Sequence, residues 1–203
     1  FGWLLKPFKT MRYLRRLNSK RQAKKNILAH YDLGDELYQT FLDSKMQYSS
    51  AIFDEEGNSL EEAQVNKLTR ICDQLKLRED DHLLEVGSGW GGLAIFAAEN
   101  YGCQVTTTTI SDNQYRYAKN KIDAAGLSNK INLLSDDYRL LQGKFEKVVS
   151  VEMIEAVGKK YLSGYFQKLH GLLKPGGLLM LQAITIADQR LKSYSSNEDF
   201  IQK

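Results

Sequence analysis

From residue 59 onward, the sequence alternates between amphipathic helical patterns and short apolar or β-branched runs. The strand-like runs are residues 82–87, 104–110, 131–137, 147–153 and 178–186. The helical patterns are residues 59–76, 93–102, 111–126 and 161–173. Parallel strands need long crossover connections, and a helix is the usual way to make one. The alternation therefore predicts a doubly wound, Rossmann-like α/β domain built on a parallel sheet.

Several residues predict where the helices begin and end. Ser59 and Glu62 have capping-box spacing, and Ser111 and Gln114 repeat it before the third helical pattern. Gly102 follows the second pattern, where a helix commonly ends on a glycine. The sequence "KPGG" predicts a stop after the last helix and before the last strand.

The loops at one edge of the sheet are the predicted ligand site, because open parallel sheets bind ligands beyond the carboxyl ends of their strands. The loops predicted to face this cleft follow Val86, Ile110, Leu134 and Val151. The last of these loops contains two glutamates, Glu152 and Glu155, with no lysine or arginine between them. At least one of the two is therefore a candidate functional residue.

The glycine-rich stretch "LEVGSGWGG" follows the first predicted strand and opens a helix. Gly87, Gly89 and Gly92 satisfy G-x-G-x-x-G, the dinucleotide-binding pattern. A nicotinamide site also needs an acid at the end of the second strand to bind the ribose, and "TTTTIS" has none. Glu85 instead completes E-x-G-x-G, which resembles motif I of S-adenosylmethionine-dependent methyltransferases. The stretch therefore favours S-adenosylmethionine over a dinucleotide.

Other segments extend this resemblance over most of the chain. They are "HYDLGDELYQTFLDSKMQYSSAIF", "VGSGWGG", "TISDNQ", "DYR" and "VSVEMIEAVGKKYLSGYF". From about residue 28 to the end, the chain resembles the cyclopropane-fatty-acyl-phospholipid synthases and the related mycolic acid cyclopropane synthases. The resemblance implies transfer of a methylene group from S-adenosylmethionine to the double bond of an unsaturated phospholipid acyl chain, which forms a cyclopropane ring.

The resemblance also implies which residues carry the reaction. Such a site must position a weak nucleophile, exclude water and remove a proton, and a bound bicarbonate is the implied base. The implied catalytic residues are Glu155, Ser50, Gln182 and Ile184. Glu155 is the glutamate of the pattern "VS-x-x-x-x-E" that would hold the bicarbonate. Glu152 falls where relatives often have a small residue, and it is assigned no catalytic role.

A second set of residues matches the cofactor-binding positions of the family. These are Tyr48, Ser49, Glu85, Gly87, Ser88, Gly89, Trp90, Gly91, Thr109, Ile110, Gln114, Asp137 and Tyr138. Thr109, Ile110 and Gln114 match a "T-[LI]-S-x-x-Q" pattern that replaces the usual acid at the ribose. Asp136 is an alternative to Asp137 for the acidic role.

The chain departs from the family pattern at three places. Ser50 replaces the cysteine of "YSCA", and Gln182 stands where many relatives have a histidine. Both side chains can donate a hydrogen bond, but an amide cannot shuttle a proton at neutral pH. The sequence ends at "NEDFIQK", before the last two strands and a further catalytic tyrosine of the family. We therefore expect a C-terminally truncated sheet and a chain that is inactive alone.

The N-terminal segment is strongly basic, although the whole chain has a net charge of only +3. Residues 1–31 carry nine Lys/Arg and no acid, whereas residues 32–203 carry 19 bases against 25 acids, a net charge of −6. Apolar residues recur every three or four positions on one side of this segment. The pattern fits a helix on an anionic membrane surface or one packed on its own domain, and nucleic acid is a weaker third option.

The predicted organisation is an N-terminal segment with an active-site lid at residues 1–58 and a methyltransferase domain at residues 59–203. No apolar run approaches the ~20 residues of a membrane span, so we expect a cytoplasmic protein peripheral to the inner face of the membrane. Two separated cysteines suggest reduced thiols, and three scattered histidines suggest no metal site. A homodimer is left open.

Two alternatives to cyclopropane formation remain. One is an enzyme of the same family that methylates carbon or nitrogen without closing a ring, which the changed residues Ser50 and Gln182 would allow. The other is a catalytically dead, membrane-binding module, which the basic segment favours and which the intact glycine motif and Glu155 oppose.

Overall fold

The computed structural model describes residues 34–190. Its centre is a five-stranded parallel sheet with the order β3-β2-β1-β4-β5. The strands are β1 (His82–Val86), β2 (Gln104–Thr108), β3 (Ile131–Leu134), β4 (Phe145–Val151) and β5 (Leu173–Gln182). The predicted doubly wound α/β class is confirmed, whereas the predicted basic helix and the last 13 residues of the sequence lie outside the described residues.

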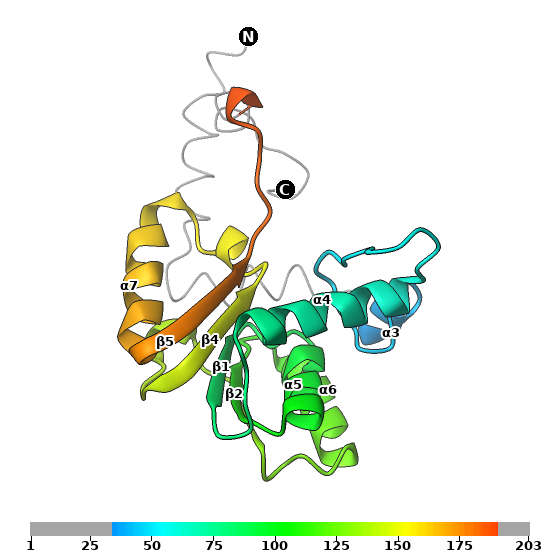
Figure 1. The fold of residues 1–203 in the computed structure, drawn as a ribbon, viewed down its shortest axis with the longest axis horizontal. Helices are drawn as coiled ribbons and strands as arrows, with labels where there is room; N and C mark the ends of the chain where they lie inside the picture. Colours follow the sequence, from blue (N-terminus) through cyan, green and yellow to red (C-terminus); the bar gives the residue numbers. More distant parts are fainter. Residues whose placement is uncertain (1–33, 191–203) are drawn as a thin grey trace.

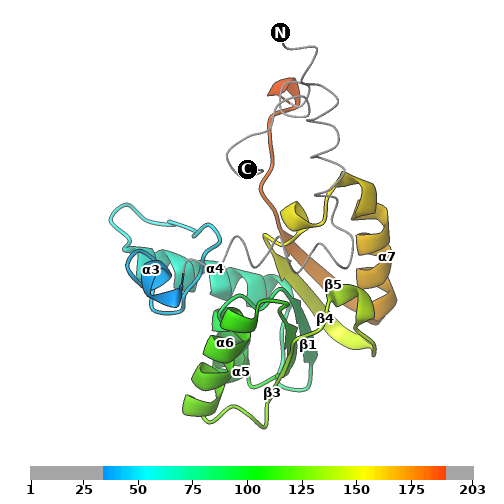
Figure 2. The ribbon, with the colours of Figure 1, turned by 180° about the vertical axis from the view of Figure 1, so that it is seen from behind.

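The helices cover both faces of this sheet (Figure 1). They are α4 (Leu60–Gln74), α5 (Gly92–Tyr101), α6 (Asp112–Ala124) and α7 (Leu162–Leu172), whereas α3 (Asp35–Gln39) lies to the side of the sheet (Figure 1), with Tyr38 packed on Trp90. Leu83 packs in the core with α4, α5 and α6, while its neighbour Leu84 packs in the second core with α7. Successive strand residues point to opposite faces, so each buried strand feeds both cores, and the view from behind shows α7 apart from α5 and α6 (Figure 2).

The strand order reverses at β1, which pairs with β2 on one side and with β4 on the other. The pairing of β1 with β4 stops at Glu85 and Val149. Beyond it, the side chain of Ser150 donates to the carbonyl of Val86 at 3.1 Å, and the Tyr165 hydroxyl donates to Ser150 at 2.8 Å. A side chain thus replaces the missing backbone partner at the point where the strand order reverses, which is where a ligand-binding crevice is expected in sheets of this type.

The helix boundaries follow the predicted signals with one exception. Ser59 and Glu62 form both halves of the capping box, and Gly102 ends α5 with a φ of 72°. The hydroxyl of Ser111 accepts from the amide of Gln114, but the reciprocal bond is absent because the Gln114 side chain accepts from Thr109 instead. The second predicted box is therefore only half formed.

The last strand starts and ends earlier in the sequence than its pattern predicts. The pattern predicts residues 178–186, whereas β5 begins at Leu173, directly after α7, and ends at Gln182. The Pro-Gly-Gly run is accommodated inside the strand because β5 lies at the sheet edge, where a proline is tolerated, and its pairing with β4 is irregular between Phe145 and Lys147. Residues 183–190 leave the sheet as an exposed segment that projects from the body (Figures 1 and 2).

Short 3-10 helices complete the loops: η1 (Tyr138–Leu140), η2 (Ile154–Ala156), η3 (Lys159–Tyr161) and η4 (Asp188–Arg190).

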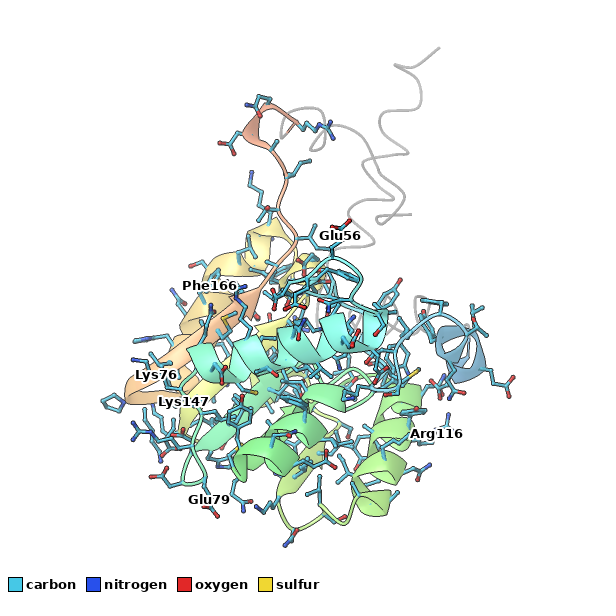
Figure 3. All side chains as sticks on the ribbon, turned by 45° about the vertical axis from the view of Figure 1, so that its right-hand side comes forward. Glu56, Lys76, Glu79, Arg116, Lys147 and Phe166 are labelled. Carbon is cyan, nitrogen blue, oxygen red and sulfur yellow. The ribbon has the colours of Figure 1, made fainter. Side chains whose placement is uncertain are left out.

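Two labelled glutamates mark the two ends of the sheet (Figure 3). Glu56 lies at the end where β5 leaves the sheet, and Glu79 lies at the opposite end, before β1. Among residues 34–190, none of the helices has the length and apolar character that crossing a membrane requires.

Candidate functional site

The glycine loop after β1 is held against the end of β2. The amides of Gly87 and Ser88 both donate to the carbonyl of Thr108, at 3.2 and 2.9 Å. Gly87, Gly89 and Gly91 have φ angles of 99°, 50° and 90°, which residues with a side chain rarely adopt. These glycines let the chain turn sharply from strand to helix and bring backbone groups to the surface of the crevice.

The loop leaves space for a ligand at one glycine and contacts the loop after β4 at another. A Cβ atom on Gly87 would lie 3.3 Å from Cγ of Met153. A Cβ atom on Gly89 would meet no atom within 4 Å. The backbone at Gly89 is therefore open to a ligand at the switch point of the sheet, which fits the predicted S-adenosylmethionine site.

Trp90 connects the loop to the N-terminal helix α3. Its side chain is 3% exposed, and its indole nitrogen donates to Oδ1 of Asp35 at 2.8 Å. The Trp90 ring also packs 4.8 Å from the ring of Tyr38, measured between centroids. Ser88 is likewise buried. The Trp90 side chain thus supports the loop from the α3 side.

Glu85 lies beneath the loop, inside the sheet. Its side chain is buried, and Oε2 accepts a hydrogen bond from the Thr107 hydroxyl at 2.6 Å. Burial raises the pKa of Glu85 to about 7, although the Thr107 bond and the charge of Lys67 oppose this shift. The structure therefore places Glu85 as a support under the predicted cofactor loop.

The end of β2 brings together Thr109, Ile110 and Gln114, the residues predicted to replace the missing ribose acid. The Thr109 hydroxyl donates to Oε1 of Gln114 at 2.9 Å and accepts from the amide of Ser111 at 3.2 Å. Both Thr109 and Gln114 are buried, and Ile110 is half-buried beside them. The arrangement thus places uncharged polar groups at the carboxyl end of β2.

The residues after β3 are held by local contacts. The Asp137 carboxylate accepts from Nε of Arg139 at 2.8 Å and forms an ion pair with the same guanidinium. The Tyr138 ring packs edge-on against Tyr165, with centroids 5.3 Å apart. The neighbouring Asp136 is exposed, and its carbonyl accepts from the Thr108 hydroxyl. Asp137 is thus committed to Arg139, whereas Asp136 presents its carboxylate to solvent.

A buried lysine that sequence reasoning missed organises the segment before α4. Lys67 has no exposed surface, and its Nζ donates to Oγ of Ser49 at 2.7 Å and to Oε1 of Gln47 at 3.0 Å. The Gln64 side chain donates to the carbonyls of the same two residues, at 3.0 and 3.2 Å. These bonds hold residues 47–49 on α4, so that Tyr48 remains about half exposed next to the crevice.

Lys67 also provides positive charge to the site. Burial lowers the pKa of Lys67 to about 8, against the opposing charges of Asp43, Glu152 and Glu85. A sequence signal existed, because Lys67 falls four residues after Ala63 on the apolar stripe of α4. A charged residue on the buried side of an amphipathic helix is rare unless it has partners.

Glu152, to which the family pattern assigns no catalytic role, is the centre of a three-residue cluster. Its Oε1 accepts from the amide and the hydroxyl of Ser50, at 3.0 and 3.1 Å, and from Nε2 of Gln182 at 2.9 Å. Its amide donates to the carbonyl of Gln182 at 2.9 Å. Glu152 also has a φ of 47°, in the left-handed region that glycine favours. Two of the four predicted catalytic residues, Ser50 and Gln182, are therefore joined through Glu152.

Glu155 and Ile184, the other two predicted catalytic residues, form a separate pair. Oε1 of Glu155 accepts from the amide of Ile184 at 2.6 Å. Glu155 is exposed, and the Ile184 side chain is 61% exposed. The structure thus brings the predicted catalytic residues together in pairs, but Glu155 makes no hydrogen bond to Ser50 or Gln182.

A pocket of about 330 Å³ adjoins this cluster. Its lining combines polar groups with apolar walls from α4 and β5: Ser50, Ile52, Arg70, Ile71, Met180, Leu181, Gln182 and Ala183. A carboxylate that can accept a proton, two donors and an apolar pocket are suited to proton removal from a largely apolar substrate. Within residues 34–190, no group of three or more His, Cys, Asp or Glu residues could hold a metal ion.

Comparisons with known proteins agree with this geometry. The chain matches the family model described as mycolic acid cyclopropane synthetase over residues 18–203. It is 44% identical over 173 residues to "Probable fatty acid methyltransferase" of Pseudomonas putida, covering 84% of this chain and 44% of the relative. It is 41% identical over 168 residues to the cyclopropane-fatty-acyl-phospholipid synthase of Escherichia coli K12, covering 83% and 43%.

A third relative and two solved structures extend the likeness. The tuberculostearic acid methyltransferase of Mycobacterium tuberculosis is 38% identical over 193 residues, covering 92% of this chain and 45% of the relative. A cyclopropane synthase from M. tuberculosis superposes with a TM-score of 0.79 at 29% identity, covering 87% and 62%. A mycolic acid cyclopropane synthase bound to SAH and CTAB superposes with a TM-score of 0.75 at 30% identity, covering 78% of this chain and 55% of that structure. The chain spans less than half the length of these curated relatives.

Proposed function

Because the chain belongs to the mycolic acid cyclopropane synthetase family, we propose that it transfers one carbon from S-adenosylmethionine to the double bond of an unsaturated phospholipid acyl chain, closing a cyclopropane ring. The observation that carries this proposal is the placement of the glycine loop after β1 and the Glu152–Ser50–Gln182 cluster along one edge of the sheet. One region suits the methyl donor and the other suits removal of a proton.

The loops after β1 and β2 are the proposed site of S-adenosylmethionine, which supplies an electrophilic methyl group when bound. The open backbone at Gly89 and the turn at Gly87 allow close approach of the ligand. The buried pair Thr109 and Gln114 offers uncharged polar groups at the end of β2, where the ribose is bound in sheets of this type.

Ser50 and the end of β5 are the proposed acyl-chain side, whereas Tyr48 and Ser49 on the same segment stay predicted cofactor contacts. An olefin is a weak nucleophile, so it must be held in line with the methyl group and away from water. The pocket beside Ser50 and Gln182 has apolar walls from Ile71 and Met180, among others, which suits an acyl chain. Bicarbonate as the bound base stays a prediction from the family resemblance.

Methylation of the acyl chain without ring closure is a second candidate. The matches to two fatty acid methyltransferases favour it, at 44% and 38% identity. Ser50 and Gln182 at positions where the family pattern has cysteine and histidine also favour a changed outcome. The two candidates share the methyl transfer and differ in which proton is removed afterwards.

Attachment to an anionic membrane surface through residues 1–31 completes the proposal. Nine bases and no acids in this segment support it, since each base near such a surface contributes roughly 1 kcal/mol. Cosedimentation with phosphatidylglycerol vesicles, but not with phosphatidylcholine vesicles, is the expected result. The location on the inner face of the membrane and a homodimer stay predictions.

The test incubates the full-length protein with S-adenosylmethionine and vesicles of an unsaturated phospholipid. A mass gain of one CH2 per acyl chain, with cyclopropane protons in the NMR spectrum, would support ring closure. The same mass gain with olefinic protons would support the second candidate. Unchanged acyl chains, in a protein that binds S-adenosylhomocysteine, would refute both.

A further inference from the structure

We propose that Glu152 is the general base of this site, so that its carboxylate does the work of a bound anion and the enzyme needs no bicarbonate. This inference rests on the proposed function and deepens it. It assigns a catalytic role to a residue that family matching leaves out.

The hydrogen bonds of the cluster define a seat for an anionic oxygen. Two donors of Ser50 and the amide of Gln182 converge on one oxygen, Oε1 of Glu152, at 2.9 to 3.1 Å. Within residues 34–190, no hydrogen bond reaches Oε2 of Glu152. One carboxylate oxygen is therefore held in place, and the other is left to accept a proton.

These contacts leave few hydrogen-bond donors for an external anion such as bicarbonate. The donors of Ser50 and Gln182, which the family pattern assigns to the anion site, are already used by Glu152. A bicarbonate on the same donors would also lie next to the Glu152 carboxylate, and two adjacent negative charges repel each other. The position that an external anion would occupy is thus taken by the carboxylate of Glu152.

The surroundings fix the direction of this carboxylate and place a positive charge near it. Lys67 is buried under the segment that carries Ser50, and its charge and that of Glu152 attract each other. The left-handed backbone at Glu152, with a φ of 47°, is rare for a residue with a side chain. It is held by the bond from the Glu152 amide to the Gln182 carbonyl at 2.9 Å. Strained residues of this kind cluster at functional sites.

Glu155 has a different position. Its Oε1 is engaged by the amide of Ile184, at the start of the exposed segment after β5. It makes no hydrogen bond to the cluster around Glu152. Glu155 is therefore a positioning residue for the backbone at Ile184.

The proton transfer balances without another reactant. The acyl double bond attacks the methyl carbon as the carbon–sulfur bond breaks, which converts the sulfonium to a thioether and leaves a carbocation on the lipid. A C–H bond of the added methyl group then breaks, its electron pair closes the ring, and Oε2 of Glu152 takes the proton. Glu152 returns the proton to water, so one proton is released per ring.

The first experiment measures turnover of the wild-type, full-length protein in carbonate-free buffer under argon and again with added bicarbonate. We expect rates within twofold of each other. A rate that falls tenfold or more without bicarbonate would overturn the inference while leaving the proposed function intact. Binding of 13C-labelled bicarbonate to the wild-type protein, followed by NMR, gives a readout that needs no turnover: binding contradicts the inference, and its absence supports it.

Two variants separate a base from a structural link. Glu152→Gln keeps an oxygen for Ser50 but accepts no proton, so we expect kcat to fall at least 100-fold while the affinity for S-adenosylhomocysteine stays within twofold. Glu152→Gly suits the left-handed backbone and frees the donors, so we expect bicarbonate to bind it and to restore part of its activity. Glu79→Gln, at the opposite end of the sheet (Figure 3), is the matched control and should match the wild type. A Glu152→Gln protein with wild-type kcat would refute the role of Glu152.

Discussion

The carboxyl edge of the sheet has two halves that are stabilised in different ways. The proposed cofactor half, residues 87–91 and 109–114, is built mainly from buried groups bonded within one loop or between adjacent strands, such as Gly87 with Thr108. The proposed reaction half, residues 47–50, 152–155 and 182–184, is half-buried to exposed and depends on bonds between distant parts of the chain, such as Ser50 with Glu152. The conformation of the cofactor half thus depends on local hydrogen bonds, whereas the conformation of the reaction half depends on tertiary contacts.

The largest expected effect comes from Gly92, where the two halves meet. A Cβ atom at this position would lie 2.3 Å from the carbonyl oxygen of Lys45 and 2.4 Å from Nε2 of Gln47. Gly92→Ala should therefore displace the segment before Tyr48, lowering the free energy of unfolding by about 1–3 kcal/mol and turnover by about 100-fold. Urea denaturation and steady-state kinetics would measure both.

Gly164 provides the control for this change, because it lies in α7 and a Cβ atom there would meet nothing within 4 Å. Gly164→Ala should raise the stability by about 0.5–1 kcal/mol, since alanine favours a helix over glycine. Equal effects of the two substitutions would remove the special role of Gly92.

Glu85 tests the rigidity of the cofactor half through pH. Its pKa is about 7 in the folded protein, against an ordinary value of 4.5. Between these values the folded state binds more protons than the unfolded state, so stability is fully present below pH 4.5 and falls as the pH rises to 7. The loss is on the order of 3 kcal/mol. Glu85→Gln should lack this part of the pH dependence, as urea denaturation at pH 4.5 and 8 would measure.

The expected effect of Glu85→Gln on stability differs between high and low pH. Relative to the wild type, Glu85→Gln should gain stability at pH 8 and lose that advantage at low pH. A variant whose stability difference from the wild type is the same at both pH values would show that Glu85 titrates normally in the folded protein.

Lys67 tests the dependence of the reaction half on one tertiary contact. Lys67→Met keeps the buried volume but loses the bonds to Gln47 and Ser49. We expect turnover to fall about tenfold, or about 1.4 kcal/mol, because the segment carrying Ser50 loses its anchor. The affinity for S-adenosylhomocysteine, measured by calorimetry, should fall only a few-fold, because Lys67 also holds Ser49, a predicted cofactor contact. Equal losses in both would mean that Lys67 supports the two halves alike.

The smallest expected effect concerns Thr109. Thr109→Val keeps the shape of the side chain but removes the bond to Gln114, and a hydrogen bond of this kind contributes about 1 kcal/mol. The dissociation constant of S-adenosylhomocysteine should rise a few-fold, with kcat nearly unchanged. A selective loss of kcat would place Thr109 functionally in the reaction half.

The features predicted well from the sequence are those set by neighbours along the chain. The alternation of patterns gave the parallel sheet, and local signals placed the capping box at Ser59 and the end of α5 at Gly102. The contact between Thr109 and Gln114 is also local, because the two residues are five positions apart, in the loop after β2 and in α6. Such contacts leave a recognisable spacing.

The features missed depend on contacts that no spacing encodes. Ser50 is 102 positions from Glu152 and 132 from Gln182, so no local spacing indicated the hydrogen bonds that join these three residues. The partners of Lys67 became visible only once α4 was packed on the sheet. The limits of β5 were misjudged because an edge strand tolerates Pro175, which local rules treat as a stop.

The convergence of three donors on one oxygen also constrains how this site can change by mutation. Removing Glu152 alone takes away the acceptor that Ser50 and Gln182 share and leaves Gln182 bonded to Ser50 only. Replacing Ser50 or Gln182 alone leaves the carboxylate with fewer donors. The effects of substitutions at the three positions should therefore be strongly non-additive. If a lineage exchanges the carboxylate of Glu152 for a bound bicarbonate, the protein with only one of the required substitutions should be less active than the proteins before and after the exchange. The three positions are therefore expected to evolve together.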